Sequence, residues 1–228
     1  MPHLSKLAAA MTGLATLAIP AHAQLTLQIL HASDLEGGLD ALNRAANFGA
    51  LVESYETAEP NTIILSAGDN YIPGPFFNAA GDRATFRDSG LFNDTYNGLY
   101  GLPDPGGVNE TYGGLREGEG RVDISIMNII GFDASAVGNH EFDNGSDAFE
   151  NIIEEDFRSV GLGDDRWVGA QFPYLSANLD FTADGNLGNL FTPDILPNSD
   201  FATGPAESIA GASDTPKLAP ATIVTVAG

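Results

Sequence analysis

The chain of 228 residues contains no cysteine, which excludes disulfide bonds, thiol catalysis and thiolate ligands for a metal. Basic residues are scarce as well: 9 Lys and Arg stand against 31 Asp and Glu, for a formal net charge of −22. Duplex nucleic acid and anionic membranes both require clustered Lys and Arg, so neither is expected as a partner. With 43 % hydrophobic residues the chain can still bury a core. Because the chain has no cysteine, any metal bound here must be held by oxygen and imidazole ligands.

Residues 1–23 have the features of a signal peptide. An apolar run over residues 7–19 follows a basic start, and Ala21-His22-Ala23 fits the small-residue rule for cleavage. The run is shorter than the roughly 20 residues that a membrane span requires, and no second run of that length follows. An uncleaved anchor is the alternative interpretation. We expect an exported protein, periplasmic or extracellular, with no membrane span after cleavage near Gln24.

Short hydrophobic runs alternate with helical patterns along the rest of the chain. Strands are expected at 25–32, 62–66, 134–137, 174–179 and 222–226, and helices at 39–57, at 122–130 and after a cap at Ser146. A strand, a helix and a strand within about 40 residues is typical of a parallel sheet, so an α/β fold is expected. In the helix at 122–130 the expected core side chains are Val122, Ile126, Ile129 and Ile130.

Two segments have no sustained hydrophobic period. Residues 78–120 contain scattered proline and glycine, which predicts a long irregular insertion, and residues 181–220 are expected to form loops. Seven aromatic residues lie in or beside the insertion: Phe76, Phe77, Phe86, Phe92, Tyr96, Tyr100 and Tyr112. They could line a pocket for a substrate base, but packing of the loop onto the domain is the favoured interpretation.

Polar residues follow three of the expected strands. Asp34 and Glu36 follow the first strand, Asp69 follows the second, and Asn139 and His140 follow the third. Ligands of open parallel sheets bind beyond the carboxyl ends of the strands, so these side chains are expected at one common edge. Carboxylate, amide and imidazole groups suit divalent Mn, Zn, Fe or Mg. Taken singly, each of these residues is as easily explained as a turn or cap residue.

Three motifs together are far more specific than any single residue. Gly138-Asn139-His140-Glu141-Phe142-Asp143 is the strongest, and it occurs with SDLEGG at 33–38 and GDNYIPG at 68–74. The combination resembles the metallophosphoesterases of calcineurin type, and among them the secreted 5′-nucleotidases and cyclic phosphodiesterases. The resemblance covers about residues 25–228 and implies a four-layer α/β/β/α sandwich. Because the sequence ends at Gly228 directly after a strand-like run, residues 24–228 are interpreted as the N-terminal part of a truncated domain.

The resemblance also implies roles for individual residues. Asp34 would bind one metal, Asp69 would bridge two metals, and Asn139 would bind the second. His140 would donate to the phosphoryl oxygen or to the leaving group. Asp143 would hold the imidazole ring of His140, which is chemically reasonable because a carboxylate on one ring nitrogen fixes the tautomer.

The chain departs from the family pattern in two ways. The first motif is usually Asp-x-His, whereas here it is Asp34-Leu35-Glu36. Glu36 can ligate Mn²⁺, Fe²⁺, Mg²⁺ or Ca²⁺, or it has left the metal site. The later histidines of the family are also absent, because His140 is the only histidine after His31. The resemblance implies two divalent ions (Mn, Zn, Fe, Mg or Ca) in the complete site. Because the later histidines are missing, this chain alone is expected to be inactive.

The leading hypothesis is an exported two-metal enzyme, similar to 5′-nucleotidases, that hydrolyses small phosphate monoesters or cyclic diesters. A catalytically inactive binding module of the same fold is the alternative, and the missing histidines favour it. A calcium-stabilised structural domain is a third hypothesis, supported by charge alone. At the strand ends, His31 is expected to be buried, and Asn178 and Asp180 are candidates to support the site.

Overall fold

The computed structural model describes residues 25–35, 41–74, 77–78, 118–157, 166–203 and 215–226. Side chains are described over the same ranges except at residues 41–43, 157 and 166. The predicted signal peptide, Glu36 and nearly all of the predicted insertion at 78–120 lie outside the described residues.

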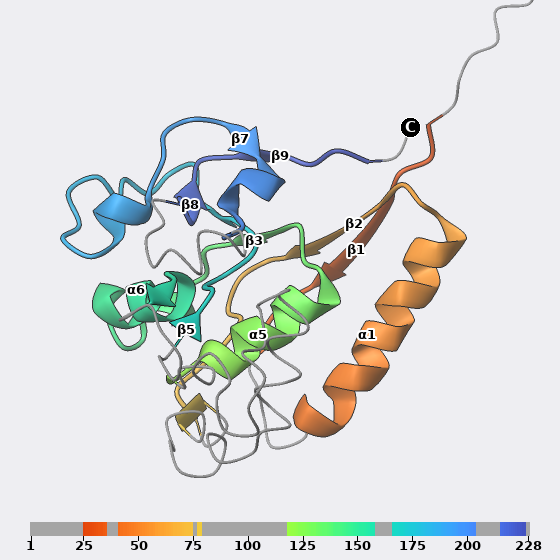
Figure 1. The fold of residues 1–228 in the computed structure, drawn as a ribbon, viewed down its shortest axis with the longest axis horizontal. Helices are drawn as coiled ribbons and strands as arrows, with labels where there is room; N and C mark the ends of the chain where they lie inside the picture. Colours follow the sequence, from red (N-terminus) through yellow and green to blue (C-terminus); the bar gives the residue numbers. More distant parts are fainter. Residues whose placement is uncertain are drawn as a thin grey trace, which may run out of the picture.

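Five parallel strands form the main sheet, in the order β1-β2-β3-β6-β8. Their bounds are Gln28–Ala32 (β1), Thr62–Ser66 (β2), Ala134–Ala136 (β3), Tyr174–Leu175 (β6) and Leu218–Ala219 (β8). Ala32 pairs with Ser66, which pairs in turn with Ser135, so the first three strands end almost level with one another. The predicted α/β class with a parallel sheet is confirmed (Figure 1).

Three helices cover one face of this sheet: α1 (Ala41–Ala58), α5 (Arg121–Ile130) and α6 (Ser146–Ile153). The chain advances through the sheet in one direction, and right-handed crossovers then place each connecting helix on the same side. α5 contacts both α1 and α6, and Figure 1 shows the three helices in a row. The described residues therefore contain a helix layer and a sheet layer of the expected sandwich.

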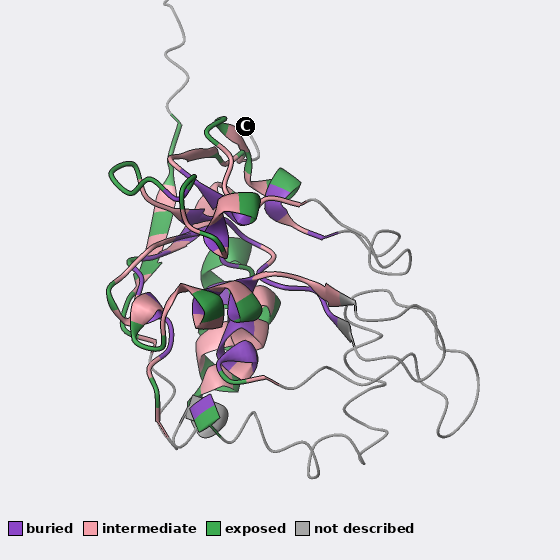
Figure 2. Cartoon of the chain, turned by 90° about the vertical axis from the view of Figure 1, so that its left-hand side faces the viewer, coloured by how far each residue is buried: buried purple, intermediate pink, exposed green. Residues whose placement is uncertain are grey.

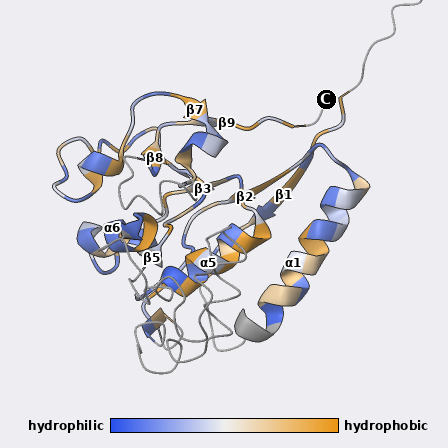
Figure 3. Ribbon diagram, in the orientation of Figure 1, coloured by the Kyte–Doolittle hydropathy of each residue, from blue (hydrophilic) through white to orange (hydrophobic). Residues whose placement is uncertain are grey.

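The hydrophobic core lies between these two layers. Ile64 of β2, Ile124 of α5 and Phe149 of α6 are fully buried. Figure 2 shows buried segments of the chain in the middle of the described structure. The second half of α5 is strongly hydrophobic (Figure 3). The expected buried face of this helix is wrong, however, because Ile129 is 60 % exposed whereas Ile124 and Met127 are buried.

The outer face of β1 is open to solvent in the described structure. Ile29 is 58 % exposed, and His31, on the same face, is exposed as well. The prediction that His31 is buried is therefore wrong. β1 is an edge strand, and the described helices cover only the face that carries Leu30 and Ala32.

The remaining elements are short. β4 (Asp156–Phe157) and β5 (Arg166–Trp167) form an antiparallel pair, and β7 (Leu196–Pro197) and β9 (Thr222–Ile223) form a parallel pair. The 3-10 helices are η1 (His140–Phe142), η2 (Leu187–Leu190) and η3 (Asn198–Phe201). Residues 181–220 thus contain more structure than the predicted loop, and the strands expected at 174–179 and 222–226 are only two residues long. None of the helices in the described ranges is long and apolar enough to cross a membrane.

Candidate functional site

Asp34 and Asp69 stand at tight turns directly beyond β1 and β2. Their φ angles are 51° and 54°, and they are the two non-glycine residues with positive φ in the part of the chain that the structure describes. The backbone N–H of Asp34 donates to the carbonyl of Gly68 at 3.3 Å, so the two turns are neighbours. Left-handed backbone at a non-glycine residue costs of order 1–3 kcal/mol and persists where surrounding contacts enforce it.

Two glycines let the loops after β2 and β3 touch. A Cβ on Gly68, whose φ is 95°, would lie 2.6 Å from the backbone nitrogen of Gly138. A Cβ on Gly138 would lie 2.6 Å from the backbone nitrogen of Asp69. Any larger residue would therefore separate the loop that carries Asp69 from the loop that carries Asn139 and His140.

Glu141 joins these two loops and was missed as a functional residue in the sequence. Its side-chain oxygen Oε2 accepts the backbone N–H groups of Gly138 (2.8 Å) and Asp69 (3.1 Å), and Oε1 accepts that of Asn70 (3.0 Å). The residue is 1 % exposed. Burial raises the pKa of the Glu141 carboxyl, and the backbone N–H groups oppose that rise. The one available signal was a carboxylate inside the motif, next to His140.

Asn70 anchors the same turn in a buried polar network. Its amide nitrogen donates to the Ser135 hydroxyl (2.8 Å) and to the Tyr174 hydroxyl (3.0 Å). Its amide oxygen accepts from the Ser66 hydroxyl at 2.5 Å. Asn70 is fully buried, so these bonds fix the β2 turn to β3 and β6 beneath the site.

His140 lies in η1 and contacts two predicted site residues. Its backbone N–H donates to Asp69 Oδ1 at 2.9 Å, and its ring nitrogen Nδ1 lies 2.7 Å from Asp143 Oδ2. Both side chains of the His140–Asp143 pair are about one third exposed. Asn139 precedes η1 directly and is partly exposed to solvent. The structure therefore brings Asp69, Asn139, His140 and Asp143 to one end of the sheet, beside Asp34.

The donor atoms at this end of the sheet are carboxylate and amide oxygens. They fit a hard divalent cation in kind. Within the described ranges, however, no three side chains of Asp, Glu, His or Cys come close enough together to hold a metal ion. That Asp34, Asp69 and Asn139 bind metal therefore stays a prediction, and Glu36, the fourth predicted ligand, lies outside the described residues.

Other residues considered in the sequence have local roles. The Asp180 carboxylate accepts the N–H (3.0 Å) and the hydroxyl (2.6 Å) of Thr182, and Asn178 Oδ1 accepts the Ser176 hydroxyl at 3.2 Å. Both residues thus make local bonds near the end of β6. Phe77 is buried and stacks on Tyr71 with ring centroids 5.6 Å apart, as expected for packing. The other six aromatic residues of that set lie outside the described residues.

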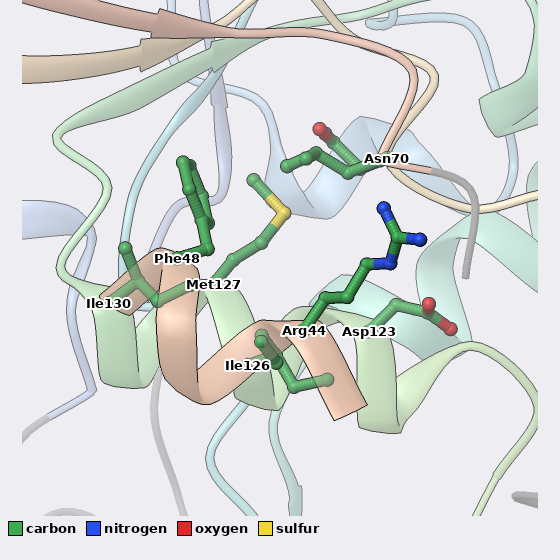
Figure 4. A pocket seen from close by; sticks show the side chains of 9 residues that line it. Arg44, Phe48, Asn70, Asp123, Ile126, Met127 and Ile130 are labelled. Carbon is green, nitrogen blue, oxygen red and sulfur yellow. The ribbon is translucent and has the colours of Figure 1, made fainter. Parts of the chain in front are cut away.

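A cavity of about 230 Å³ lies between α1 and α5 (Figure 4). Phe48, Met127 and Ile130 gather at one end of it, and Arg44 and Asn70 lie toward the other. Pockets that enclose drug-sized ligands measure about 300–1,000 Å³, so this cavity is too small for a nucleotide. The strand-end turns are the better candidate site.

Comparisons with known proteins place the chain among relatives of known activity. No protein-family model matches the chain. The 5′-nucleotidase of Mus musculus is 28 % identical over 199 residues, which cover 81 % of this chain and 25 % of the mouse protein. The chain is related to the 5′-nucleotidases over their N-terminal part. The family predicted from the three motifs is thereby confirmed.

A bacterial relative and a solved structure are also similar to the chain. The trifunctional nucleotide phosphoesterase protein YfkN of Bacillus subtilis is 26 % identical over 162 residues, which cover 71 % of this chain and 8 % of that protein. The crystal structure of a 5′-nucleotidase precursor from Thermus thermophilus is 20 % identical with a TM-score of 0.38, and the match covers 71 % of this chain and 24 % of that one. The chain spans about a quarter of the mouse 5′-nucleotidase and a smaller share of YfkN.

Proposed function

We propose that this chain supplies part of the active site of an exported, metal-dependent phosphoesterase of 5′-nucleotidase type. The substrates are small phosphate monoesters, nucleotides among them, or cyclic phosphodiesters. The observation that carries the proposal is the contact between Asp69 and His140, two residues from different motifs, at the carboxyl end of the parallel sheet. The 5′-nucleotidase relatives support the same reaction class.

Asp34, Asp69 and Asn139 would hold the metals, together with Glu36 and with ligands beyond the described residues. Two bound divalent cations would supply the positive charge that a phosphate ester needs in a protein of net charge −22. The left-handed turns that carry Asp34 and Asp69 are joined by the hydrogen bond from the Asp34 N–H to the Gly68 carbonyl, which supports a shared role for the two carboxylates.

His140 would act on the phosphoryl oxygen or on the leaving group. Its Nδ1 lies 2.7 Å from Asp143 Oδ2, and this contact would fix the orientation of the ring. The Nε2 atom is then the one that would donate a proton. Asp143 supports this role by orienting the imidazole.

The test uses protein expressed from the complete coding sequence. We expect Mn²⁺-dependent release of phosphate from AMP or of 4-nitrophenol from bis(4-nitrophenyl) phosphate. Asp69→Asn is expected to weaken Mn²⁺ binding and abolish turnover, whereas His140→Ala is expected to lower kcat by roughly 10²–10⁴ while Mn²⁺ still binds. Asp200→Asn serves as the charge-matched control, because Asp200 is exposed in η3 and its carboxylate accepts only the neighbouring Ser199 hydroxyl among the described contacts.

The outcomes separate the candidate functions. Unchanged turnover in both site variants would refute the residue assignment. Absence of turnover in the parent protein, with weak metal uptake, would favour an inactive binding module of this fold. Export is tested separately, by sequencing the N-terminus of the protein recovered outside the cytoplasm, where we expect a start near Gln24.

A further inference from the structure

We propose that Glu141 is a positioning residue that holds the turn carrying Asp69 against the loop carrying Asn139 and His140. Its carboxylate shapes the metal-binding end of the sheet before a metal arrives. This inference rests on the proposed function, because it assigns Glu141 a role toward the metal ligands named there.

The contacts of Glu141 bridge two distant segments of the chain. The carboxylate accepts backbone N–H groups from Asp69 and Asn70, which are 72 and 71 residues away in sequence, and from Gly138 three residues before it. The Tyr71 hydroxyl donates to the backbone carbonyl of Glu141 at 3.3 Å. The β2 turn is thus fixed to the η1 loop by both the side chain and the main chain of one residue.

The bonds to Asp69 and Asn70 explain how a left-handed turn is maintained. Consecutive backbone N–H groups around a left-handed residue form a concave site that favours an anion. Here the anion is the protein's own carboxylate, at 3.1 Å from Asp69 N and 3.0 Å from Asn70 N. The Asp69 side chain is then directed toward the η1 loop, where its Oδ1 accepts the His140 N–H.

The three backbone N–H groups that face Glu141 require three acceptor positions. The two oxygens of the glutamate carboxylate supply them. A glutamine has one acceptor oxygen and one NH₂ group. If its oxygen took the place of Oε2, the NH₂ group would face the N–H of Asn70; in the opposite orientation it would face those of Asp69 and Gly138. Glu141→Gln therefore breaks at least one of the three bonds with almost no change in volume.

The experiment compares Glu141→Gln with Asp133→Asn in protein from the complete coding sequence. Asp133 is a matched control, because its half-buried carboxylate accepts the N–H of Ile64 (2.9 Å) and the side-chain amide of Asn198 (3.1 Å) at the opposite end of β3. Two quantities are measured: amide hydrogen exchange at Asp69, Asn70 and Gly138 without metal, and the Kd for Mn²⁺.

We expect Glu141→Gln to accelerate exchange at one or more of these three amides by at least about 10-fold and to weaken Mn²⁺ binding by about 10–100-fold. Asp133→Asn is expected to leave both quantities within about 2-fold of the parent. Unchanged exchange and unchanged Kd in Glu141→Gln would overturn the inference, and so would an equal loss in both variants, which would indicate general destabilisation.

Failure of the proposed function gives a different result. A parent protein that binds no Mn²⁺ would overturn the proposed metal site, and the exchange rates would then decide alone whether Glu141 holds the two loops. Fast exchange at the three amides in the parent protein would overturn that role as well.

Discussion

Replacing Glu154 by glutamine is expected to stabilise the protein at alkaline pH and to have little effect at acidic pH. Glu154 follows α6 directly, and its pKa is raised from 4.5 to about 7 by burial and then by Glu150, Glu155 and Asp156, while Arg121 opposes the rise. Between these values the native state binds more protons than the unfolded chain, so stability falls as the pH rises through this window. Glutamine carries no charge, so this fall in stability with rising pH disappears.

The magnitude follows from the gap between the two pKa values. At about 1.4 kcal/mol for each pH unit, the gap of about 2.5 units corresponds to at most about 3.5 kcal/mol. Because the Glu154 side chain is only half buried, water screens part of this energy, and we expect a gain of about 1 to 2 kcal/mol at pH 8. At pH 5 the gain is expected to be below about 0.5 kcal/mol, because the native carboxyl is then already protonated.

Urea unfolding measures this difference through the fluorescence of Trp167, which is the single tryptophan and is fully buried. Glu53→Gln is the control, since Glu53 is exposed on α1. A gain from Glu154→Gln that is equal at pH 5 and pH 8, or no larger than that of the control at pH 8, would refute the reasoning.

Two further substitutions test packing, one in the buried interior and one at the candidate site. Lys217→Met is expected to lower the free energy of unfolding by about 3 kcal/mol or more. The buried ammonium donates to the carbonyls of Ala170 (2.8 Å) and Phe201 (2.9 Å), and these acceptors would lose their partner. A urea titration showing a loss below about 1 kcal/mol would contradict this. Gly138→Ala is expected to weaken Mn²⁺ binding and lower the Tm, because the added Cβ would overlap the Asp69 carboxylate and lie 2.6 Å from its backbone nitrogen. A Kd equal to that of the parent would show that the loops separate without consequence.

The first half of the sheet was predictable because hydrophobic runs and polar strand ends coincide there. The strand at 62–66 has the expected bounds, and the helix expected at 39–57 is Ala41–Ala58. Buried parallel strands are continuously apolar, so they contrast sharply with the turn residues that follow. The same contrast predicted that Asp34 and Asp69 lie at one edge of the sheet, as their neighbouring turns show.

Other features depend on contacts between residues far apart in the sequence. β8 is only two residues long and lies in a segment predicted as loop, beside the fully buried Lys217. Lysine is rarely buried, so its hydropathy does not predict the position of Lys217. The buried ammonium is stable here because acceptors from other segments of the chain bind it. The cap predicted at Ser146 is wrong as well: Gly145 occupies the N-cap with φ 91°, and the Ser146 hydroxyl accepts from Asn186 instead.

The candidate site also combines a feature that was predicted from the sequence with one that was not. The family resemblance implied the pairing of His140 with Asp143, and the structure contains it. The role of Glu141 does not follow, because no local pattern marks a carboxylate whose donors belong to a turn about 70 residues earlier. Likewise, helices pack on both sides of α5, so its hydrophobic residues are not confined to one face. The exposed position of Ile129 could therefore not be predicted from their spacing.

If Asp34 and Asp69 bind the metals as proposed, their left-handed backbone sets metal binding and thermal tolerance against each other during evolution. Glycine or asparagine adopts such φ angles at lower cost, so substitutions that remove a metal-binding carboxylate would also relieve local strain. A population selected for heat resistance alone would therefore accumulate changes at these two positions and drift toward a more robust protein without a metal site. Retention of both aspartates under such pressure would be a signature of selection for metal binding.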